Sequence, residues 1–340
     1  MIKTQRRSRI FPSLRNLKTA IISRPWLFHG LLKAINLPFI GDVYDFFYLK
    51  RVKAKALGSL RQIVIEPNNV CNLACIMCPY PDMERPKITM PLDLFQSIVD
   101  QAKELGCLEV GLQQYNEPYT DKLLFDRIRH VRSHGMRCYY YSNGTLLGQN
   151  DHIAKTLADS PNLICFSLDG FTKETFEKIR VKADRDKTYA GIEALYNERN
   201  RRGQAEPRIE IFFTLTEENR HELDEFQKYW KTRADFVSVF PVDARKDERF
   251  VKLDYKKLKA YPCFNQAELI VLSNGTLALC CFDVNGGYEI GDLRKQTLRE
   301  VLAGRKFRGI LESHFQRHGQ PEVCLNCSKL RIDSAFYWWF

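Results

Sequence analysis

From residue 61 onward, short apolar runs rich in β-branched residues alternate with amphipathic stretches of helical period. Six runs are expected to form strands: RQIVIEP (61–67), CLEVGLQQ (107–114), RCYYYS (137–142), LICFSLD (163–169), IEIFFTL (209–215) and FVSVFPV (236–242). Helices are expected at 91–105, near 121–134, near 151–158, in stretches up to about 201, and near 218–230. Pro91 is expected to open the first helix, and Gly106 and Gly135 to stop the first two. Repeated strand-helix units imply parallel strands with right-handed crossovers, so the sequence predicts an α/β fold with a (βα)6 sheet, either a partial barrel or a doubly wound sheet.

Polar and thiol-rich motifs follow the expected strands. CNLACIMC (71–78) comes after the first strand, YNEP (115–118) after the second, SNGT (142–145) after the third and SLDG (167–170) after the fourth. In either architecture the carboxyl ends of parallel strands form one rim, where active sites lie. The sequence therefore predicts one site that gathers all four motifs.

The first of these motifs places Cys71, Cys75 and Cys78 within eight residues. No apolar run reaches the roughly 18 residues of a membrane-spanning helix, and no secretory signal is evident, so the reducing cytoplasm is the expected compartment. There, cysteines are expected to be metal ligands or buried small residues and not disulfides. Three thiolates leave a tetrahedral zinc site one ligand short. They can, however, bind three irons of a 4Fe-4S cluster and leave the fourth iron open.

The spacing C-x3-C-x2-C in the loop after the first strand resembles the radical S-adenosylmethionine (SAM) enzymes, over about residues 60–245. The resemblance implies a (βα)6 partial TIM barrel and a 4Fe-4S cluster held by Cys71, Cys75 and Cys78. It also implies that the open iron binds the amino and carboxylate groups of SAM. Reduction then splits SAM into methionine and a 5'-deoxyadenosyl radical, which abstracts a substrate hydrogen.

The other motifs match the family pattern residue by residue. In YNEP, Glu117 keeps the carboxylate that receives the SAM ammonium, while Tyr115 and Asn116 replace two glycines of the family's Gly-Gly-Glu-Pro stretch. The remaining SAM contacts implied by the resemblance are Ser142 and Asn143 at the ribose, the fourth-strand pair Ser167 and Asp169, Arg180 at the SAM carboxylate, and Met77 beside adenine. Tyr115 and Asp243 lie at expected strand ends and are candidates for substrate contact or proton transfer. Each motif also has a plain structural interpretation, as a turn, a cap or a solvated helix residue.

A second cysteine set follows the barrel. AELIVLS and TLALC flank Ser273-Asn274-Gly275 as an expected β-hairpin, residues 291–314 are expected to form one or two helices, and CLNC comes after them. This region resembles the twitch domain, a shortened SPASM domain, which implies an auxiliary 4Fe-4S cluster on Cys263, Cys280, Cys324 and Cys327. Cys281 is the alternative to Cys280, and a four-cysteine zinc site is the alternative to the cluster. Cys107, Cys138 and Cys165 fall within expected strands and are expected to be buried.

The positive charge is concentrated at the N-terminus. The whole chain carries +11, yet residues 1–60 alone hold twelve Lys or Arg against Asp42 and Asp45. With its apolar residues, this arm could lie at an anionic membrane surface, brace the barrel or serve as an organelle-targeting segment. Nucleic acid is not an expected partner, because no nucleic-acid-binding module accompanies the charge.

These observations divide the chain into a basic helical arm (1–60), a radical SAM barrel (61–245) and an auxiliary-cluster domain (246–340). The expected function is a radical SAM oxidoreductase or maturase acting on a peptide, carbohydrate or lipid-linked glycan. A flavodoxin- or ferredoxin-type donor is expected to supply electrons. The alternative is a noncatalytic iron-sulfur or zinc protein that carries electrons or binds a partner.

Overall fold

The computed structural model describes residues 60–149, 151–241, 268–316 and 318–325, together with Cys263, Cys327 and six isolated positions between 30 and 46. Most of the basic arm, Asp243 and the aromatic C-terminal residues 336–340 (FYWWF) therefore lie outside the described residues. In the described part, none of the helices is both long and apolar enough to cross a bilayer.

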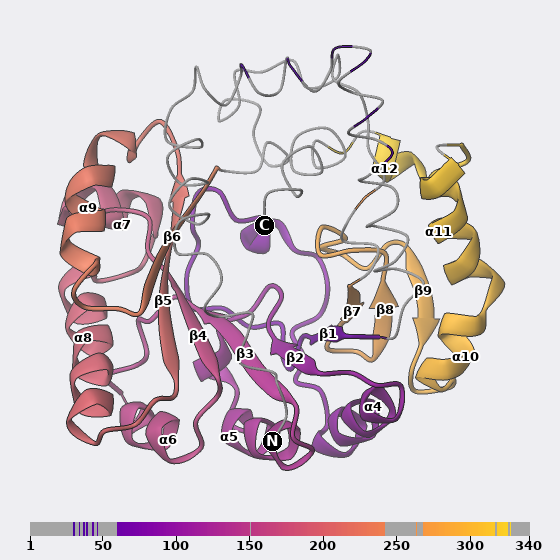
Figure 1. Ribbon diagram of the computed structural model, residues 1–340, viewed down its shortest axis with the longest axis horizontal. Helices are drawn as coiled ribbons and strands as arrows, with labels where there is room; N and C mark the ends of the chain where they lie inside the picture. The colour runs from indigo at the N-terminus through magenta and orange to yellow at the C-terminus, as the bar shows by residue number, and fades with distance from the viewer. Residues whose placement is uncertain are drawn as a thin grey trace.

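Six parallel strands form a curved, open wall with helices on its outer side (Figure 1). The strands are β1 (Gln62–Ile65), β2 (Glu109–Leu112), β3 (Arg137–Ser142), β4 (Leu163–Ser167), β5 (Arg208–Leu215) and β6 (Phe236–Pro241). The outer helices are α4 (Leu92–Glu104), α5 (Leu124–Ser133), α6 (His152–Ala158), α7 (Lys173–Ile179), α8 (Arg185–Arg201) and α9 (Leu223–Trp230). The strands lie in sequence order from β1 to β6, whereas a doubly wound sheet would reverse direction in its middle. The fold is thus the partial barrel.

Local sequence explains the helix ends. Gly106 and Gly135 adopt positive φ values of 85° and 68° just beyond α4 and α5. Glycine takes this left-handed conformation without the steric cost paid by other residues, so it stops the helix there. Pro91 proves to be the residue that precedes the first turn of α4, not a member of it.

The main core lies between the sheet and its helices. Along β1, Ile63 and Ile65 join the large apolar cluster that includes Phe95 of α4, whereas Val64 packs on the opposite face of the strand with Ile270. This alternation is the period of two expected of a strand. β1 therefore has both faces covered.

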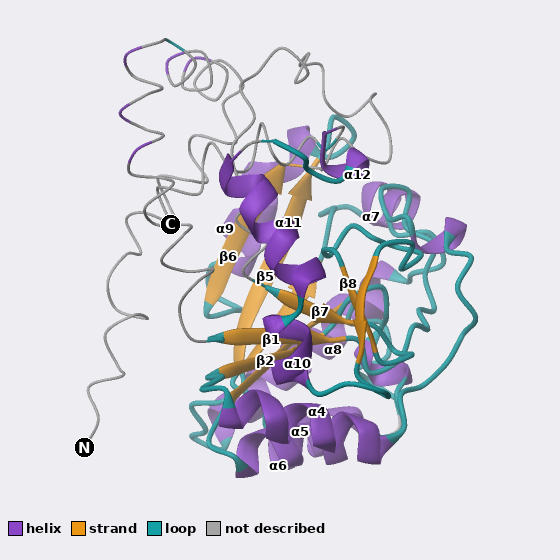
Figure 2. Ribbon diagram, turned by 90° about the vertical axis from the view of Figure 1, so that its right-hand side faces the viewer, coloured by secondary structure: helices purple, strands orange, loops and turns teal. Residues whose placement is uncertain are grey.

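The C-terminal segment continues the barrel sheet. The expected hairpin is present as β7 (Leu269–Val271) and β8 (Thr276–Ala278), and a third strand, β9 (Glu289–Asp292), pairs antiparallel with β8. β7 pairs in parallel with β1, giving one nine-stranded sheet in the order β6-β5-β4-β3-β2-β1-β7-β8-β9. Figure 2 shows α10 (Leu298–Ala303) and α11 (Arg305–Gln316) in front of this part of the sheet. The helical stretch expected from residue 291 is thus wrong at its start, because residues 291 and 292 belong to β9 and a Thr297–Glu300 capping box begins α10.

Candidate functional site

The loop that carries the first three cysteines follows β1 at the carboxyl-terminal rim. Two backbone hydrogen bonds fix it against the end of α7 and the chain that follows: the N–H of Ala74 donates to the carbonyl of Val181 (3.1 Å), and that of Ile76 to the carbonyl of Ile179 (3.0 Å). Backbone hydrogen bonds thus help to position the loop.

Each of the three sulfurs has an N–H group directed at it. Arg180 Nη1 lies 3.7 Å from Cys75 Sγ, Asn143 Nδ2 lies 3.9 Å from Cys71 Sγ, and the backbone N–H of Tyr80 lies 3.5 Å from Cys78 Sγ. Burial raises the pKa of Cys71 to about 12 and also raises that of Cys75, which the nearby Arg180 partly offsets. Thiolates need a compensating positive charge in such a place, and a metal centre supplies it.

The donor set favours a cluster over a single ion. Three thiols leave a tetrahedral zinc site one ligand short, whereas they can bind three irons of a 4Fe-4S cluster and leave the fourth iron open. The N–H groups aimed at the three sulfurs also fit a cluster held by thiolates.

Glu117 lies beside the cysteine loop as a buried carboxylate, 1% exposed. It accepts hydrogen bonds from Ser142 Oγ (2.8 Å), from the backbone N–H of Asn143 (2.7 Å) and from that of Tyr119 (3.2 Å). Its own N–H donates to the carbonyl of Val70, next to the first cysteine (2.8 Å). Desolvation raises the pKa of Glu117 to about 7, although the three hydrogen bonds oppose this shift. A cation that reaches the carboxylate would relieve the cost of keeping it charged.

Arg180 and Asp169 form a buried ion pair at the same rim. The other carboxylate oxygen of Asp169 accepts the backbone N–H of Thr214 (2.7 Å). Burial alone would lower the pKa of Arg180, but the negative charges of Asp169 and Cys75 outweigh burial and raise it. The guanidinium Nε is buried and has no hydrogen-bond partner among the described residues. Arg180 thus holds a donor available to a ligand.

The structure brings together Glu117, Ser142, Asn143, Asp169, Arg180 and the three cysteines through direct contacts. Ser167 is half-buried at the end of β4, and Met77 is half-buried within the cysteine loop. The Tyr115 hydroxyl donates to the carbonyl of Cys281 (2.8 Å), so it joins the rim to the C-terminal segment. Its expected role in substrate contact stays a prediction, as does that of Asp243.

Sequence reasoning missed Glu66, which directly follows β1. This carboxylate is fully buried and forms a two-pronged ion pair with Arg85 (2.7 and 2.8 Å). It also accepts the backbone N–H groups of Tyr115 (3.4 Å) and Ser273 (3.0 Å). The sequence did carry a signal for Glu66, because an acidic residue follows an apolar strand just before the cysteine motif. Glu66 ties together the β1 end, the β2 loop and the C-terminal hairpin.

The second cysteine set also gathers in space. Cys324 is buried with Leu279 and Ile310, and both Cys263 and Cys327 pack against this small cluster. The N–H of Cys327 donates to the carbonyl of Cys324 (3.1 Å), which closes the CLNC turn. Burial raises the pKa of Cys324 to about 12, and the neighbouring Cys327 adds to the shift.

The two consecutive cysteines that follow the hairpin differ in surroundings. Cys281 packs against the cluster of Val64, Ile270, Leu272 and Ala278 on the barrel side. Cys280 accepts the N–H of Phe282 at its sulfur (3.3 Å). Cys107, Cys138 and Cys165 are buried in the barrel core, as expected.

Comparison with known proteins agrees with this geometry. Residues 65–229 match the radical SAM superfamily, and residues 263–328 match SPASM, an iron-sulfur cluster-binding domain. The protein therefore belongs to the radical SAM superfamily and carries a SPASM-type extension. Its cofactors are 4Fe-4S clusters and SAM.

A curated relative is a tungsten-containing aldehyde ferredoxin oxidoreductase cofactor-modifying protein of Pyrococcus furiosus, 28% identical over 176 residues. The match covers 50% of this chain and 48% of the relative, so the chain spans about half the length of that relative.

Solved structures share the fold. SuiB of Streptococcus suis bound to precursor peptide SuiA aligns with a TM-score of 0.62 and 15% identity, covering 88% of this chain and 76% of SuiB. BtrN in complex with AdoMet and 2-DOIA aligns with a TM-score of 0.54 and 15% identity, covering 79% of this chain and 93% of BtrN. anSMEcpe with bound AdoMet aligns with a TM-score of 0.56 and 18% identity, covering 80% of this chain and 87% of anSMEcpe.

Proposed function

We propose that the protein is a radical SAM maturase that cleaves SAM reductively and removes a hydrogen atom from a peptide substrate. The observation that carries the proposal is the contact network at the rim. In it, a buried carboxylate (Glu117) and a buried guanidinium (Arg180) both reach the thiol loop, the first through Asn143 and the second at Cys75. Two groups of opposite charge suit an amino-acid moiety, because its amino group can donate hydrogen bonds to the carboxylate and its carboxylate can accept them from the guanidinium.

The residues take the following roles in this proposal. Cys71, Cys75 and Cys78 hold the cluster. Glu117 receives the ammonium of SAM, and Arg180, steadied by Asp169, offers its Nε–H to the carboxylate. The nucleoside part of SAM contacts four side chains. Ser142 and Asn143 bind the ribose, Met77 packs on adenine, and Ser167 lies at the end of β4.

The auxiliary cluster is proposed to use Cys263, Cys280, Cys324 and Cys327. Cys280 is preferred to Cys281, because the latter packs on the barrel side while its carbonyl accepts hydrogen bonds from Gln114 (2.9 Å) and Tyr115 (2.8 Å). When the clusters are bound, the first supplies the electron that splits SAM into methionine and the 5'-deoxyadenosyl radical, and the second accepts the electron of a substrate radical.

The peptide substrate is proposed on the likeness to SuiB, whose structure contains a precursor peptide. The 5'-deoxyadenosyl radical takes one hydrogen atom and becomes 5'-deoxyadenosine. Loss of one electron and one proton from the substrate then completes a two-electron oxidation. Epimerisation and crosslinking begin with the same abstraction, and a carbohydrate or a lipid-linked glycan is the alternative substrate class.

The test is turnover by the anaerobically reconstituted protein with dithionite, followed by chromatography and mass spectrometry. We expect 5'-deoxyadenosine from the wild type and less than about 1% of that amount from Cys75→Ala, because a lost ligand removes the cluster that reduces SAM. Cys138→Ala, a buried cysteine in β3, is the matched control and should keep activity. Iron and sulfide present in the wild type without any 5'-deoxyadenosine would instead support the noncatalytic alternative.

A further inference from the structure

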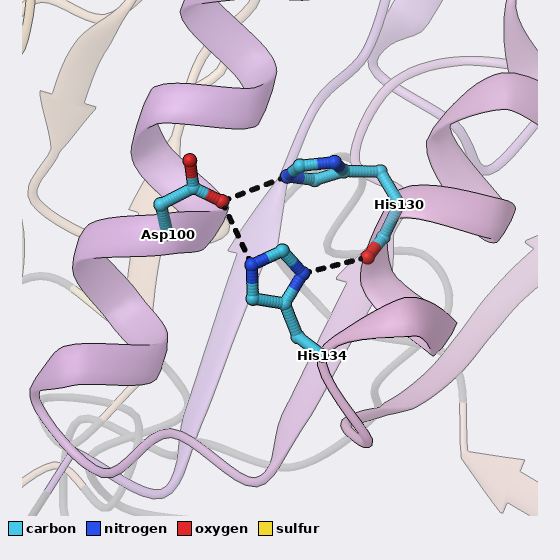
Figure 3. Close-up of side chains that lie close together, drawn as sticks. All are labelled: Asp100, His130 and His134. Carbon is cyan, nitrogen blue, oxygen red and sulfur yellow. Dashed lines mark hydrogen bonds and ion pairs between the residues drawn. The ribbon is translucent and has the colours of Figure 1, made fainter.

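Asp100, His130 and His134 form a compact cluster on the outer helical layer, apart from the SAM site. Asp100 projects from α4, while His130 lies on α5 and His134 caps its end (Figure 3). β3 begins at Arg137, so His134 lies near the amino-terminal end of that strand. The cysteine loop lies at the opposite, carboxyl-terminal edge of the sheet. The rim chemistry therefore gives no account of this cluster.

The three side chains converge with the geometry of metal ligands. Asp100 Oδ1 lies 2.8 Å from His130 Nε2 and 3.1 Å from His134 Nε2, and all three ligand atoms lie within 4.8 Å of one another. The histidines are four positions apart, which places both rings on one face of a helical turn. Tetrahedral zinc with bonds of about 2.0–2.1 Å separates its N and O ligands by about 3.3 Å, so only a slight opening of the three side chains is needed.

Hydrogen bonding fixes the tautomer of His134. Its Nδ1 lies 2.9 Å from the carbonyl oxygen of His130, which can only accept, so Nδ1 carries a proton. In the neutral ring, Nε2 then presents its lone pair to Asp100 Oδ1, another acceptor. The two atoms repel unless a positive charge lies between them, either a second proton or a metal ion. A histidine that donates Nδ1–H to a backbone carbonyl while Nε2 binds metal is the usual arrangement in metal sites.

The cluster is also accessible. The side chain of Asp100 is 50% exposed, and those of His130 and His134 are 18% and 28% exposed, so an ion can enter without disturbing the core. Two imidazoles and one carboxylate suit Zn²⁺ and its neighbours, and such sites bind Fe²⁺ less tightly than Zn²⁺.

We propose that Asp100, His130 and His134 bind one divalent transition-metal ion of the Zn²⁺ class, which cross-links α4 to α5. Water fills the fourth position. The ion braces the amino-terminal side of the barrel and takes no part in SAM cleavage.

The test measures zinc in protein whose clusters are already loaded, so that the cysteines are occupied by iron. Reconstituted protein is dialysed against buffered micromolar Zn²⁺, and zinc, iron and sulfide are measured on the same sample. We expect one zinc per chain in the wild type and more than about tenfold weaker binding in His130→Ala and Asp100→Asn. His221→Ala, an exposed histidine outside the cluster, is the matched control and should retain the ion.

Zinc X-ray absorption gives a second readout. Nitrogen and oxygen neighbours at about 2.0–2.1 Å without sulfur at about 2.3 Å are expected. Sulfur neighbours would place the zinc at cysteines and overturn the proposal. Equal zinc content in wild type and variants, or none in iron-loaded wild type, would overturn it as well and leave a proton-bridged cluster. Unchanged iron and sulfide contents show that the variants are folded.

Discussion

The proposed role of Glu117 predicts how SAM affinity depends on pH. The carboxylate is buried and its pKa is raised to about 7, chiefly by desolvation. The SAM ammonium binds its ionised form. Affinity should therefore be low below the midpoint, rise with pH through it and level off above it. Thiolates and a reduced cluster add negative charge, which would move the midpoint upward and not downward.

The magnitude follows from the ionised fraction. With a pKa of about 7, roughly one tenth of Glu117 is ionised at pH 6 and roughly nine tenths at pH 8, and apparent affinity scales with the competent fraction. The contribution of Glu117 should thus increase about tenfold over this interval. Glu117→Gln removes the charge, and at pH 8 the loss should be about 1.5–3 kcal/mol, the range for hydrogen bonds to charged groups.

Equilibrium dialysis of SAM against the oxidised, reconstituted protein measures this affinity without turnover. Titration of the SAM amine affects wild type and Glu117→Gln alike, so the ratio of their affinities isolates the carboxylate. Ser142→Ala is the matched control, because it keeps the charge and removes one hydrogen bond to it (2.8 Å). That variant should keep the pH dependence with a higher midpoint. An affinity ratio that is the same at pH 6 and pH 8 would refute the reasoning.

Three further changes test how the rim is built. Arg85→Met leaves the Glu66 carboxylate buried without its partner and should lower the free energy of unfolding, measured by urea titration, by about 3–5 kcal/mol. Adding Glu66→Gln should recover part of this loss. A loss below about 1 kcal/mol contradicts the reasoning. Gly170→Ala places a methyl group 2.5 Å from the Phe176 backbone nitrogen and should cost about 1–3 kcal/mol, so an unchanged melting temperature speaks against that close approach. Tyr115→Phe loses a hydrogen bond worth about 1 kcal/mol and should speed hydrogen exchange in the adjoining C-terminal turn without changing SAM affinity. Unchanged exchange with reduced product formation would instead indicate proton transfer by Tyr115.

The barrel could be predicted because its signals are local. Strands β1 to β5 are short apolar runs that are mostly buried, and residues such as Gly106 and Gly135 mark where helices stop. The motifs could be placed on one rim, since parallel strands with right-handed crossovers align their carboxyl ends. Glu117, Ser142 and Asn143 are in contact for this reason, although 25 residues separate the first two.

The pairing of β7 with β1 could not be predicted in the same way. β7 has three residues, and nothing in its own sequence tells which edge strand it will join. The choice depends on the fold as a whole, because β1 is left with an unpaired edge once the six barrel strands are in order. Strand β9 was not predicted for a related reason, because its residues Gly291 and Asp292 lie directly before a helical pattern.

The continuity of the sheet bears on how the two cysteine sets can work together. β1 leads into the first set, and β7, hydrogen-bonded to it, belongs to the hairpin that leads into Cys280. At the end of these strands, the Glu66 carboxylate pairs with Arg85 and accepts backbone N–H groups from the β2 loop and the hairpin turn. Arg85 also donates to the carbonyl of Val284 (2.7 Å). Any hinge between barrel and extension would have to break a strand pairing and expose a buried charge, which costs several kcal/mol. The described part of the extension around β7 and the hairpin turn is therefore fixed to β1, and under the proposed function it would form a wall of the site.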